Sequence, residues 1–324
     1  MGIGNLRLLG LPPLGDLAKA SEVEDPIDRN VYRPIAYVIV GLLKNTSVTP
    51  NQITLASTLI GVAAGIAWIH GSRAAMVAGG ILLLASSILD GADGMLARVK
   101  KIQSQLGRAV DGSADMVVAL ATVFPGVYHV WTQTHEVVYL AVILPVTFLT
   151  ACSVYLYDYY KELFLRLATG RKGEGETLEG LAAQKAELVE KGAGLLDRMV
   201  IDNYSTMVRF QQMETGLTNP GVRELEKLEG SARTAAIYRK HNKGPMNLWA
   251  WISLTPHCYI MASLGIADRL HWYFWLRVVG MNALFVIALV WQRIATQRTL
   301  RELESGLPAV EQDQQRRESD ERGE

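Results

Sequence analysis

The sequence predicts an all-α, polytopic membrane protein with six transmembrane helices. Apolar residues make up 49% of the 324 residues and charged residues only 20%, and the apolar residues gather in six separate blocks. Each block is roughly 20 residues long, which is the length that an α-helix needs to cross the hydrocarbon core of a bilayer. A buried helix of a soluble protein could explain one such block, but six in one chain favour a membrane protein.

The charge balance and the cysteine count exclude several classes of function. The chain has 32 Lys and Arg residues against 32 Asp and Glu residues, so its formal net charge is zero. A large, uniformly basic face is therefore excluded, and no nucleic-acid partner is expected. Two cysteines provide neither a disulfide framework nor a cysteine-based zinc site.

In chain order, the first element is an N-terminal arm, residues 1–48. It contains an interfacial amphipathic helix at Ile27–Leu43, which is apolar on one side but too short and too charged to cross a membrane. Residues 49–160 contain transmembrane helices one to four, and residues 245–295 contain helices five and six. The predicted spans are Ile53–His70, Ala74–Met95, Val110–Trp131, Val137–Tyr157, Leu248–Ile266 and Trp272–Trp291.

Two polar segments complete the chain. The insert, residues 161–244, is rich in Glu, Lys, Ala and Leu, and its apolar positions recur at helical spacing. It is expected to form cytoplasmic helices that pack on the membrane domain or on a second copy of the chain. The tail, residues 296–324, is dense in charged residues and is expected to be cytoplasmic and disordered.

Lys and Arg residues predict the orientation of the chain. They are concentrated in the N-terminal arm, in the loop between the second and third spans, and at the start of the tail, whereas the opposite side has only Arg73 and Arg269. By the positive-inside rule, both termini are expected in the cytoplasm, and in a bacterium the protein would lie in the inner membrane.

Four aspartates stand at the facing ends of the second and third spans, namely Asp90, Asp93, Asp111 and Asp115. Charged groups are costly at such a depth, so a functional role is expected. At about 100° per residue, Asp90 and Asp93 project from one face of their helix, and Asp111 and Asp115 project from one face of the next. The two faces can oppose each other, because only a short connection joins the helices.

This arrangement favours a site for divalent cations. Oxygen ligands suit Mg²⁺ or Mn²⁺, and four carboxylates can hold two ions that clamp a diphosphate. Small residues on the same two faces leave space for a ligand, and Arg98 offers a planar donor fork for phosphate oxygens. These small residues are Gly94, Ala97 and Gly107. Ion pairs at helix ends would not require this combination.

The same positions form one extended motif. It reads Asp90-x-x-Asp93-Gly94-x-x-Ala97-Arg98, then eight residues, then Gly107-x-x-x-Asp111-x-x-x-Asp115. At every fixed position it resembles the signature of the CDP-alcohol phosphotransferases. The segment Thr49–Thr54 also resembles the family's sequence at the start of its first span. The resemblance covers roughly Asp28–Leu156 at the level of sequence, and the last two spans by topology alone.

The resemblance implies transfer of a substituted phosphate from a CDP-linked donor to a hydroxyl, with release of CMP, in phospholipid biosynthesis. The donor would be CDP-diacylglycerol or a CDP-alcohol, and the acceptor a lipid or a small alcohol. A homodimer is an expectation from the family only. Asp90, Asp93 and Asp111 would hold two metal ions, and Asp115, near one of them, would be the general base. The CDP site would comprise Asn51, Thr54, Gly94, Ala97, Arg98, Ser104 and Gly107.

The sequence says less about the chemical identity of the acceptor than about the metal site or the donor site. Family members with a phosphorylated polyol acceptor tend to carry an Arg pair near the end of the fourth span, and this chain has no Arg there before Arg166. Tyr155 and Asp158 could instead form a cage for the ammonium group of choline or ethanolamine. An interfacial aromatic belt is the favoured alternative for these tyrosines.

Two other functions are compatible with intramembrane aspartates. An intramembrane prenyltransferase would show a second Asp-rich motif far away in the sequence, whereas Asp158 and Asp268 stand alone. A non-enzymatic cation transporter could use the four carboxylates, but it would not require Arg98 or the glycines on the same face.

Overall fold

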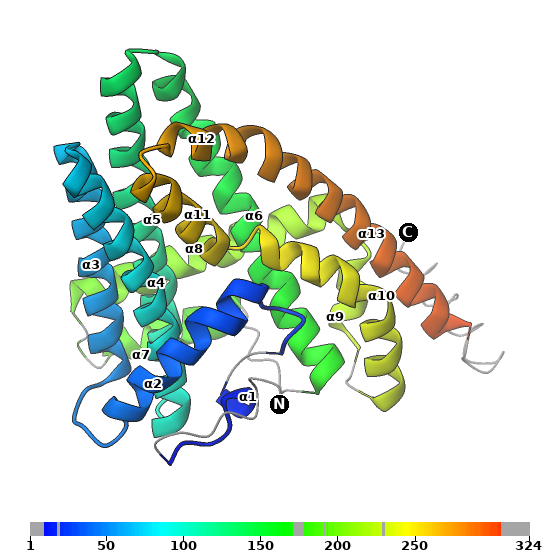
Figure 1. Ribbon diagram of the computed structural model, residues 1–324. Coiled ribbons are helices and arrows are strands. Elements are labelled where there is room, and N and C mark those ends of the chain that lie inside the picture. Colours follow the sequence, from blue (N-terminus) through cyan, green and yellow to red (C-terminus); the bar gives the residue numbers. More distant parts are fainter. Residues whose placement is uncertain are drawn as a thin grey trace.

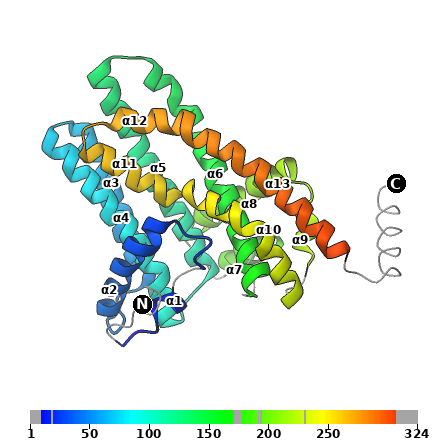
Figure 2. The same cartoon turned by 45° about the vertical axis from the view of Figure 1, so that its right-hand side comes forward.

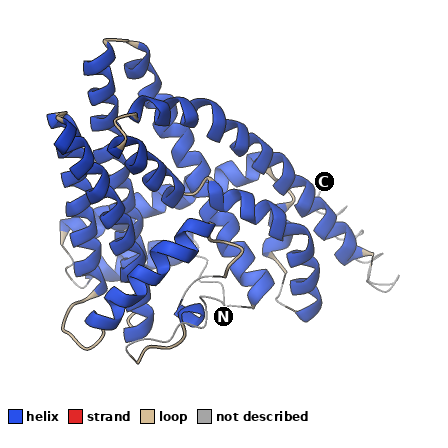
Figure 3. Cartoon of the chain, viewed as in Figure 1, coloured by secondary structure: helices blue, strands red, loops and turns tan. Residues whose placement is uncertain are grey.

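The computed structural model describes residues 10–17, 20–170, 178–190, 192, 194–228 and 231–305. Over this part of the chain the structure consists of helices and connecting segments without a strand, which confirms the all-α class (Figure 3). Segments labelled η are short π-helices. The first half contains α1 (Leu14–Leu17), η2 (Asp28–Tyr32), α2 (Arg33–Leu43), α3 (Pro50–His70), α4 (Arg73–Lys100), α5 (Gln105–Thr134) and α6 (Val138–Thr169). The second half contains α7 (Leu178–Glu190), α8 (Leu195–Thr218), α9 (Val222–Glu226), α10 (Ala232–Trp251), α11 (Leu254–Ile266), α12 (Leu270–Trp275), η3 (Leu276–Met281) and α13 (Asn282–Glu304).

Local sequence signals set the starts of the long helices. Thr49 and Gln52 form a capping box at α3: the Thr49 hydroxyl accepts from the Gln52 amide N–H, and the Gln52 side chain accepts from the Thr49 amide N–H. Ser72 and Ser104 cap α4 and α5 in the same way, each through its hydroxyl. These side chains satisfy amide donors that have no partner within the first turn of a helix.

Glycines allow α3 to lie directly against its neighbours. A Cβ atom on Gly65 would stand 1.7 Å from the carbonyl oxygen of Ala121 on α5, and one on Gly61 would stand 2.7 Å from a methyl group of Val118. The backbones of α3 and α5 therefore approach more closely at Gly65 than any other residue would permit. Such small residues are typical of helix contacts within membranes, because they let backbones come close.

Gly65→Ala is therefore expected to destabilise the fold strongly. The added methyl group meets backbone on a neighbouring helix, so α3 and α5 must move apart, at a cost of about 1–3 kcal/mol or more. Thermal unfolding in detergent measures the effect. The matched control is Gly216→Ala on α8, where the nearest atom is the flexible end of Arg223 at 3.3 Å. An equal midpoint of unfolding for both variants would contradict the role of Gly65.

Among the described residues, five helical segments are long and apolar enough to cross a membrane, and they begin at Pro50, Arg73, Leu106, Val138 and Leu270. The fifth predicted span, Leu248–Ile266, is divided instead between the end of α10 and the 13-residue α11, with a break at Ile252 and Ser253. At 1.5 Å per residue, α11 is about 20 Å long, which is less than the roughly 30 Å core of a bilayer. The predicted number of six spans is therefore not confirmed.

The insert is helical and lies against the membrane helices. α7 packs on α8, and α8 packs against α5 and α6. In Figures 1 and 2, α8 runs across these long helices rather than beside them. The Phe210 ring of α8 lies between two aromatic rings of α6, with ring centroids 6.0 Å from Phe148 and 6.1 Å from Tyr155. The insert therefore adds a layer to the bundle on the side formed by α5 and α6.

The C-terminal boundary differs from the prediction. α13 continues to Glu304, so the expectation of a disordered tail from residue 296 is wrong for residues 296–304. Buried Thr296 and Thr299 explain the extension: Thr296 accepts a hydrogen bond from Asn219, and Thr299 accepts one from Asn242. The remainder of the predicted tail, residues 306–324, lies outside the described residues.

Candidate active site

The site is built where α4 ends and α5 begins. Lys101 closes α4 in the left-handed conformation (φ 56°), and its amide N–H returns to the carbonyls of Ala97 and Arg98. Ser104 then opens α5 as its N-cap. α3 packs closely against both helices, whereas the backbones of α4 and α5 stay further from each other. Side chains therefore occupy the space between the α4 and α5 backbones, and carboxylates from the two helices approach each other across it.

Three of the four aspartates of the motif come together in this region. Asp90, Asp93 and Asp111 each offer one carboxylate oxygen, and these oxygens lie within 4.8 Å of one another. Asp93 is buried and accepts a hydrogen bond from the Thr54 hydroxyl at 2.5 Å. Three carboxylates at this spacing repel each other unless a cation or protons reduce their charge. An all-oxygen donor set of this kind fits Mg²⁺ or Mn²⁺.

Asp115 stands outside this group of three. It lies one helical turn after Asp111 on α5, which displaces it by about 6 Å along the helix axis, and its side chain is half-buried. The structure therefore separates Asp115 from the closest carboxylates while keeping it on the same side of α5. That position is compatible with a role other than direct metal binding.

The predicted CDP-site residues also meet at these helix ends. The Arg98 side chain folds back along α4, so that its Nη1 atom lies 3.7 Å from the position of a Cβ on Gly94. A Cβ on Gly107 would lie 3.0 Å from the Ser104 hydroxyl and 3.9 Å from the side-chain oxygen of Asn51. Half-buried Ala97 completes the set one turn before Lys101. Helices α3, α4 and α5 thus each contribute to the region.

Arg33 is a neighbour of the site that the sequence did not single out. It lies on α2, which crosses in front of α4 in Figure 1, and its Nη1 atom donates to the carbonyl of Gly91 at 3.5 Å. Its guanidinium group lies 3.1 Å from Glu24 and 3.2 Å from Asp28. Burial alone would lower the pKa of Arg33, but these two carboxylates outweigh burial and raise it. Arg33 thus fixes α2 to the segment that carries Asp90 and Asp93.

The insert also reaches this region. Asn203 on α8 donates a hydrogen bond to the Ser113 hydroxyl at 3.2 Å. The ring of Tyr204 lies 3.8 Å from the position of a Cβ on Gly112. Gly112 and Ser113 stand between Asp111 and Asp115, so α8 forms a wall beside the aspartate-bearing turn. The sequence of the insert contained no motif that would have indicated this contact.

The two candidate acceptor residues lie on α6, and each of them contacts another side chain of the protein. The ring of Tyr155 packs edge-on against Phe210, and Asp158 forms an ion pair with Lys161 one turn later. Tyr157, between them, donates to the carbonyl of Val23 in the N-terminal arm at 2.7 Å. These contacts tie α6 to the insert and to the arm.

Residues 47–169 match the family model described as CDP-alcohol phosphatidyltransferase. The chain carries a CDP-alcohol phosphatidyltransferase domain. The matched segment comprises α3 to α6, and therefore includes the three clustered aspartates and all the predicted CDP-site residues. Members of this family are transferases that act on CDP-linked donors and alcohol acceptors in a membrane.

Two curated relatives support this assignment of the domain. One is the bifunctional IPC transferase and DIPP synthase of Thermococcus kodakarensis, which is 36% identical over 105 residues, or 30% of this chain and 23% of the relative. The other is the protein of the same name from Archaeoglobus fulgidus, which is 38% identical over 92 residues, or 28% of this chain and 18% of the relative. The matched region spans less than a quarter of either relative.

Proposed function

We propose that this protein transfers a substituted phosphate from a CDP-linked donor to an acceptor hydroxyl and releases CMP. The observation that carries this proposal is the convergence of Asp90, Asp93 and Asp111 within the matched domain. A cation transporter would not require the accompanying Arg98 and glycines, and a prenyltransferase would show a second Asp-rich motif. The family match favours the phosphotransferase over both alternatives.

The clustered aspartates supply the metal site in this proposal. Asp90, Asp93 and Asp111 would hold Mg²⁺ or Mn²⁺, with Asp115 near a second ion. When bound, such ions neutralise a diphosphate and stabilise the oxygens of an in-line displacement. Thr54 fixes the rotamer of Asp93 through its hydrogen bond, so one carboxylate is oriented before a ligand arrives.

The donor site in this proposal lies beside those carboxylates. Gly94, Ala97 and Gly107 leave the backbone open to a nucleotide, because none of them carries more than a methyl group. Arg98 would donate in a planar fork to phosphate oxygens. Asn51 and Ser104 place polar atoms around Gly107, where they could contact the cytidine half of the donor.

Asp115 would be the general base. It would take the proton from the acceptor hydroxyl as that oxygen forms a bond to the phosphorus atom bearing the transferred substituent. The bond from this phosphorus to the bridging oxygen of the diphosphate breaks, and CMP leaves with the bonding electrons. A position one turn away from Asp111 would let Asp115 face the acceptor while the other carboxylates face the donor.

We propose a lipid or a small alcohol as the acceptor, with CDP-diacylglycerol or a CDP-alcohol as the donor. Because Tyr155 packs on Phe210 and Asp158 pairs with Lys161, both side chains have partners within the protein, and neither contact favours an ammonium cage. An ammonium cage would need the charge of Asp158, which Lys161 already balances.

The purified full-length protein in lipid micelles with Mg²⁺ is expected to release CMP with one donor and acceptor pair. The panel combines CDP-diacylglycerol with inositol, inositol phosphate, glycerol phosphate and serine. It also combines CDP-choline, CDP-ethanolamine and CDP-glycerol with diacylglycerol, and Asp115→Asn serves as the blank. Absence of both CMP release and CDP binding would contradict the proposed function.

A further inference from the structure

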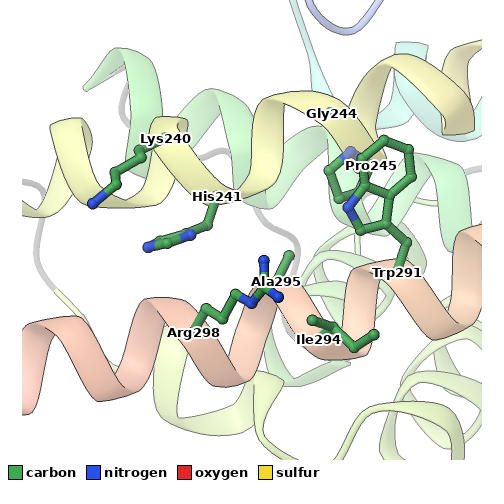
Figure 4. A pocket seen from close by; sticks show the side chains of 8 residues that line it. All are labelled: Lys240, His241, Gly244, Pro245, Trp291, Ile294, Ala295 and Arg298. Atoms are coloured by element: carbon green, nitrogen blue, oxygen red, sulfur yellow. The ribbon is translucent and has the colours of Figure 1, made fainter.

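A second polar site lies away from the aspartates, between α10 and α13. A cavity of about 200 Å³ opens there, lined by Lys240, His241, Gly244 and Pro245 of α10 and by Trp291, Ile294, Ala295 and Arg298 of α13. Figure 4 shows the cationic side chains on one side of this cavity and the Trp291 ring against α10 on the other. In Figure 1 these two helices lie on the right, whereas α3 to α5 lie on the left.

The cavity is lined by Lys240 and His241, which share one carboxylate, and by Arg298, for which no ion pair is found among the described residues. Lys240 and His241 share Glu302, whose oxygens lie 2.8 Å and 2.6 Å from their nitrogen atoms. Arg298 is exposed, and among the residues that the structure describes it forms no ion pair. Near the cavity, the permanent positive charges of Lys240 and Arg298 are therefore balanced by a single carboxylate, that of Glu302. A guanidinium group in this position is suited to phosphate, which it can bind through two parallel hydrogen bonds.

The size of the cavity limits what it can enclose. Pockets that surround a whole drug-sized ligand measure about 300–1,000 Å³, and this cavity is smaller. Its apolar wall is rigid: the Trp291 indole lies 2.7 Å from the position of a Cβ on Gly244, so the ring rests on the α10 backbone. A ligand would therefore insert one charged end, and the remainder would lie outside.

An exposed apolar stripe on α13 leads away from the charged end of the cavity. Leu284, Ile287, Trp291 and Ile294 are all exposed. At 100° per residue they share one face with Arg298, within about 80°. From Leu284 to Arg298 this face extends for about 20 Å at 1.5 Å per residue, which exceeds half the thickness of a hydrocarbon core. The stripe thus offers a path for an acyl chain, and its charged end is Arg298, about one turn beyond Ile294.

We propose that the cavity between α10 and α13 binds the phosphate group of an anionic membrane lipid, with an acyl chain of that lipid lying along the α13 stripe. Arg298 and Lys240 contact the phosphate oxygens, and Trp291 and Ile294 contact the start of the chain. Basic pockets beside membrane helices bind anionic head groups for the same electrostatic reason. This site is separate from the proposed donor site and does not use its aspartates.

The test measures binding of short-chain phosphatidylglycerol to the delipidated full-length protein by native mass spectrometry, with phosphatidylcholine of the same chain length as the reference lipid. The protein is expected to prefer phosphatidylglycerol, and Arg298→Gln is expected to weaken that binding about tenfold, as for the loss of a hydrogen bond between charged groups. The matched control is Arg293→Gln, which removes the same charge from the opposite, also exposed, face of α13. It is expected to bind like the wild type.

Two results would overturn the proposal. Equal weakening by Arg293→Gln and Arg298→Gln would mean that only the overall charge of α13 attracts the lipid. Full displacement of phosphatidylglycerol by millimolar glycerol phosphate or inorganic phosphate would assign the cavity to a soluble phosphate instead. Asp115→Asn is expected to retain the binding, so failure here and failure of the proposed reaction are distinguishable.

Discussion

Asp115→Asn is expected to reduce CMP release by about 10²–10⁴-fold, the range attributed to a general base in enzymes. The amide has nearly the same shape as the carboxylate, but it cannot accept the proton of the acceptor hydroxyl. Because Asp115 stands outside the closest group of carboxylates, the metal site and the donor site should remain formed. Binding of CDP and the midpoint of thermal unfolding are therefore expected to stay close to those of the wild type.

The control for this variant is Asp268→Asn. Asp268 lies in the turn before α12 with φ 57°, a conformation that Asn also accepts readily. Its side chain is about half exposed, and it belongs to another part of the chain from the motif. Full CMP release is expected from this control. Full CMP release from Asp115→Asn as well would refute the assignment of the base.

The aspartate site could be predicted largely from the sequence, because helical periodicity alone places its residues. Asp90, Asp93, Gly94 and Arg98 share one face of any regular helix, and α4 is regular through this stretch. The caps at Thr49 and Ser104 are local signals too, and the structure uses both. Local patterns thus determine which side chains point to the same side, and where α3 and α5 begin.

The remaining features depend on tertiary contacts that no local pattern encodes. Arg33 lies in the segment Ile27–Leu43, which is predicted to be an interfacial helix, yet the fold buries it between two carboxylates and the carbonyl of Gly91. The apolar block at Leu248–Ile266 is long enough to cross a membrane, but the chain breaks it at Ser253. The contact of Tyr204 with Gly112 joins segments far apart in the sequence. In each case the local structure depends on which other segment of the chain packs against the residues, and the sequence pattern does not identify that segment.

Asp93→Asn is expected to raise the Mg²⁺ concentration for half-maximal CMP release by about tenfold or more, and to lower the maximal rate. The charge of Asp93 is one of three that converge within 4.8 Å, and an amide oxygen attracts a divalent cation less strongly than a carboxylate. The amide can still accept the Thr54 hydrogen bond, so the local structure should persist. Titration with Mg²⁺, and binding of Mn²⁺ measured by electron paramagnetic resonance without substrate, report the two effects separately.

Thr54→Val separates the charge of Asp93 from its orientation. It keeps the carboxylate and a side chain of similar shape, but it removes the hydroxyl that donates to Asp93. Loss of such a supporting hydrogen bond typically costs about 10–100-fold in metal affinity or activity, so this variant should also need more Mg²⁺ while still binding Mn²⁺ at high concentration. An unchanged Mg²⁺ titration in Asp93→Asn would contradict metal binding by Asp93. A weakened titration in both variants, with the larger loss in Asp93→Asn, would support a metal site in which Thr54 orients one carboxylate before the cation binds.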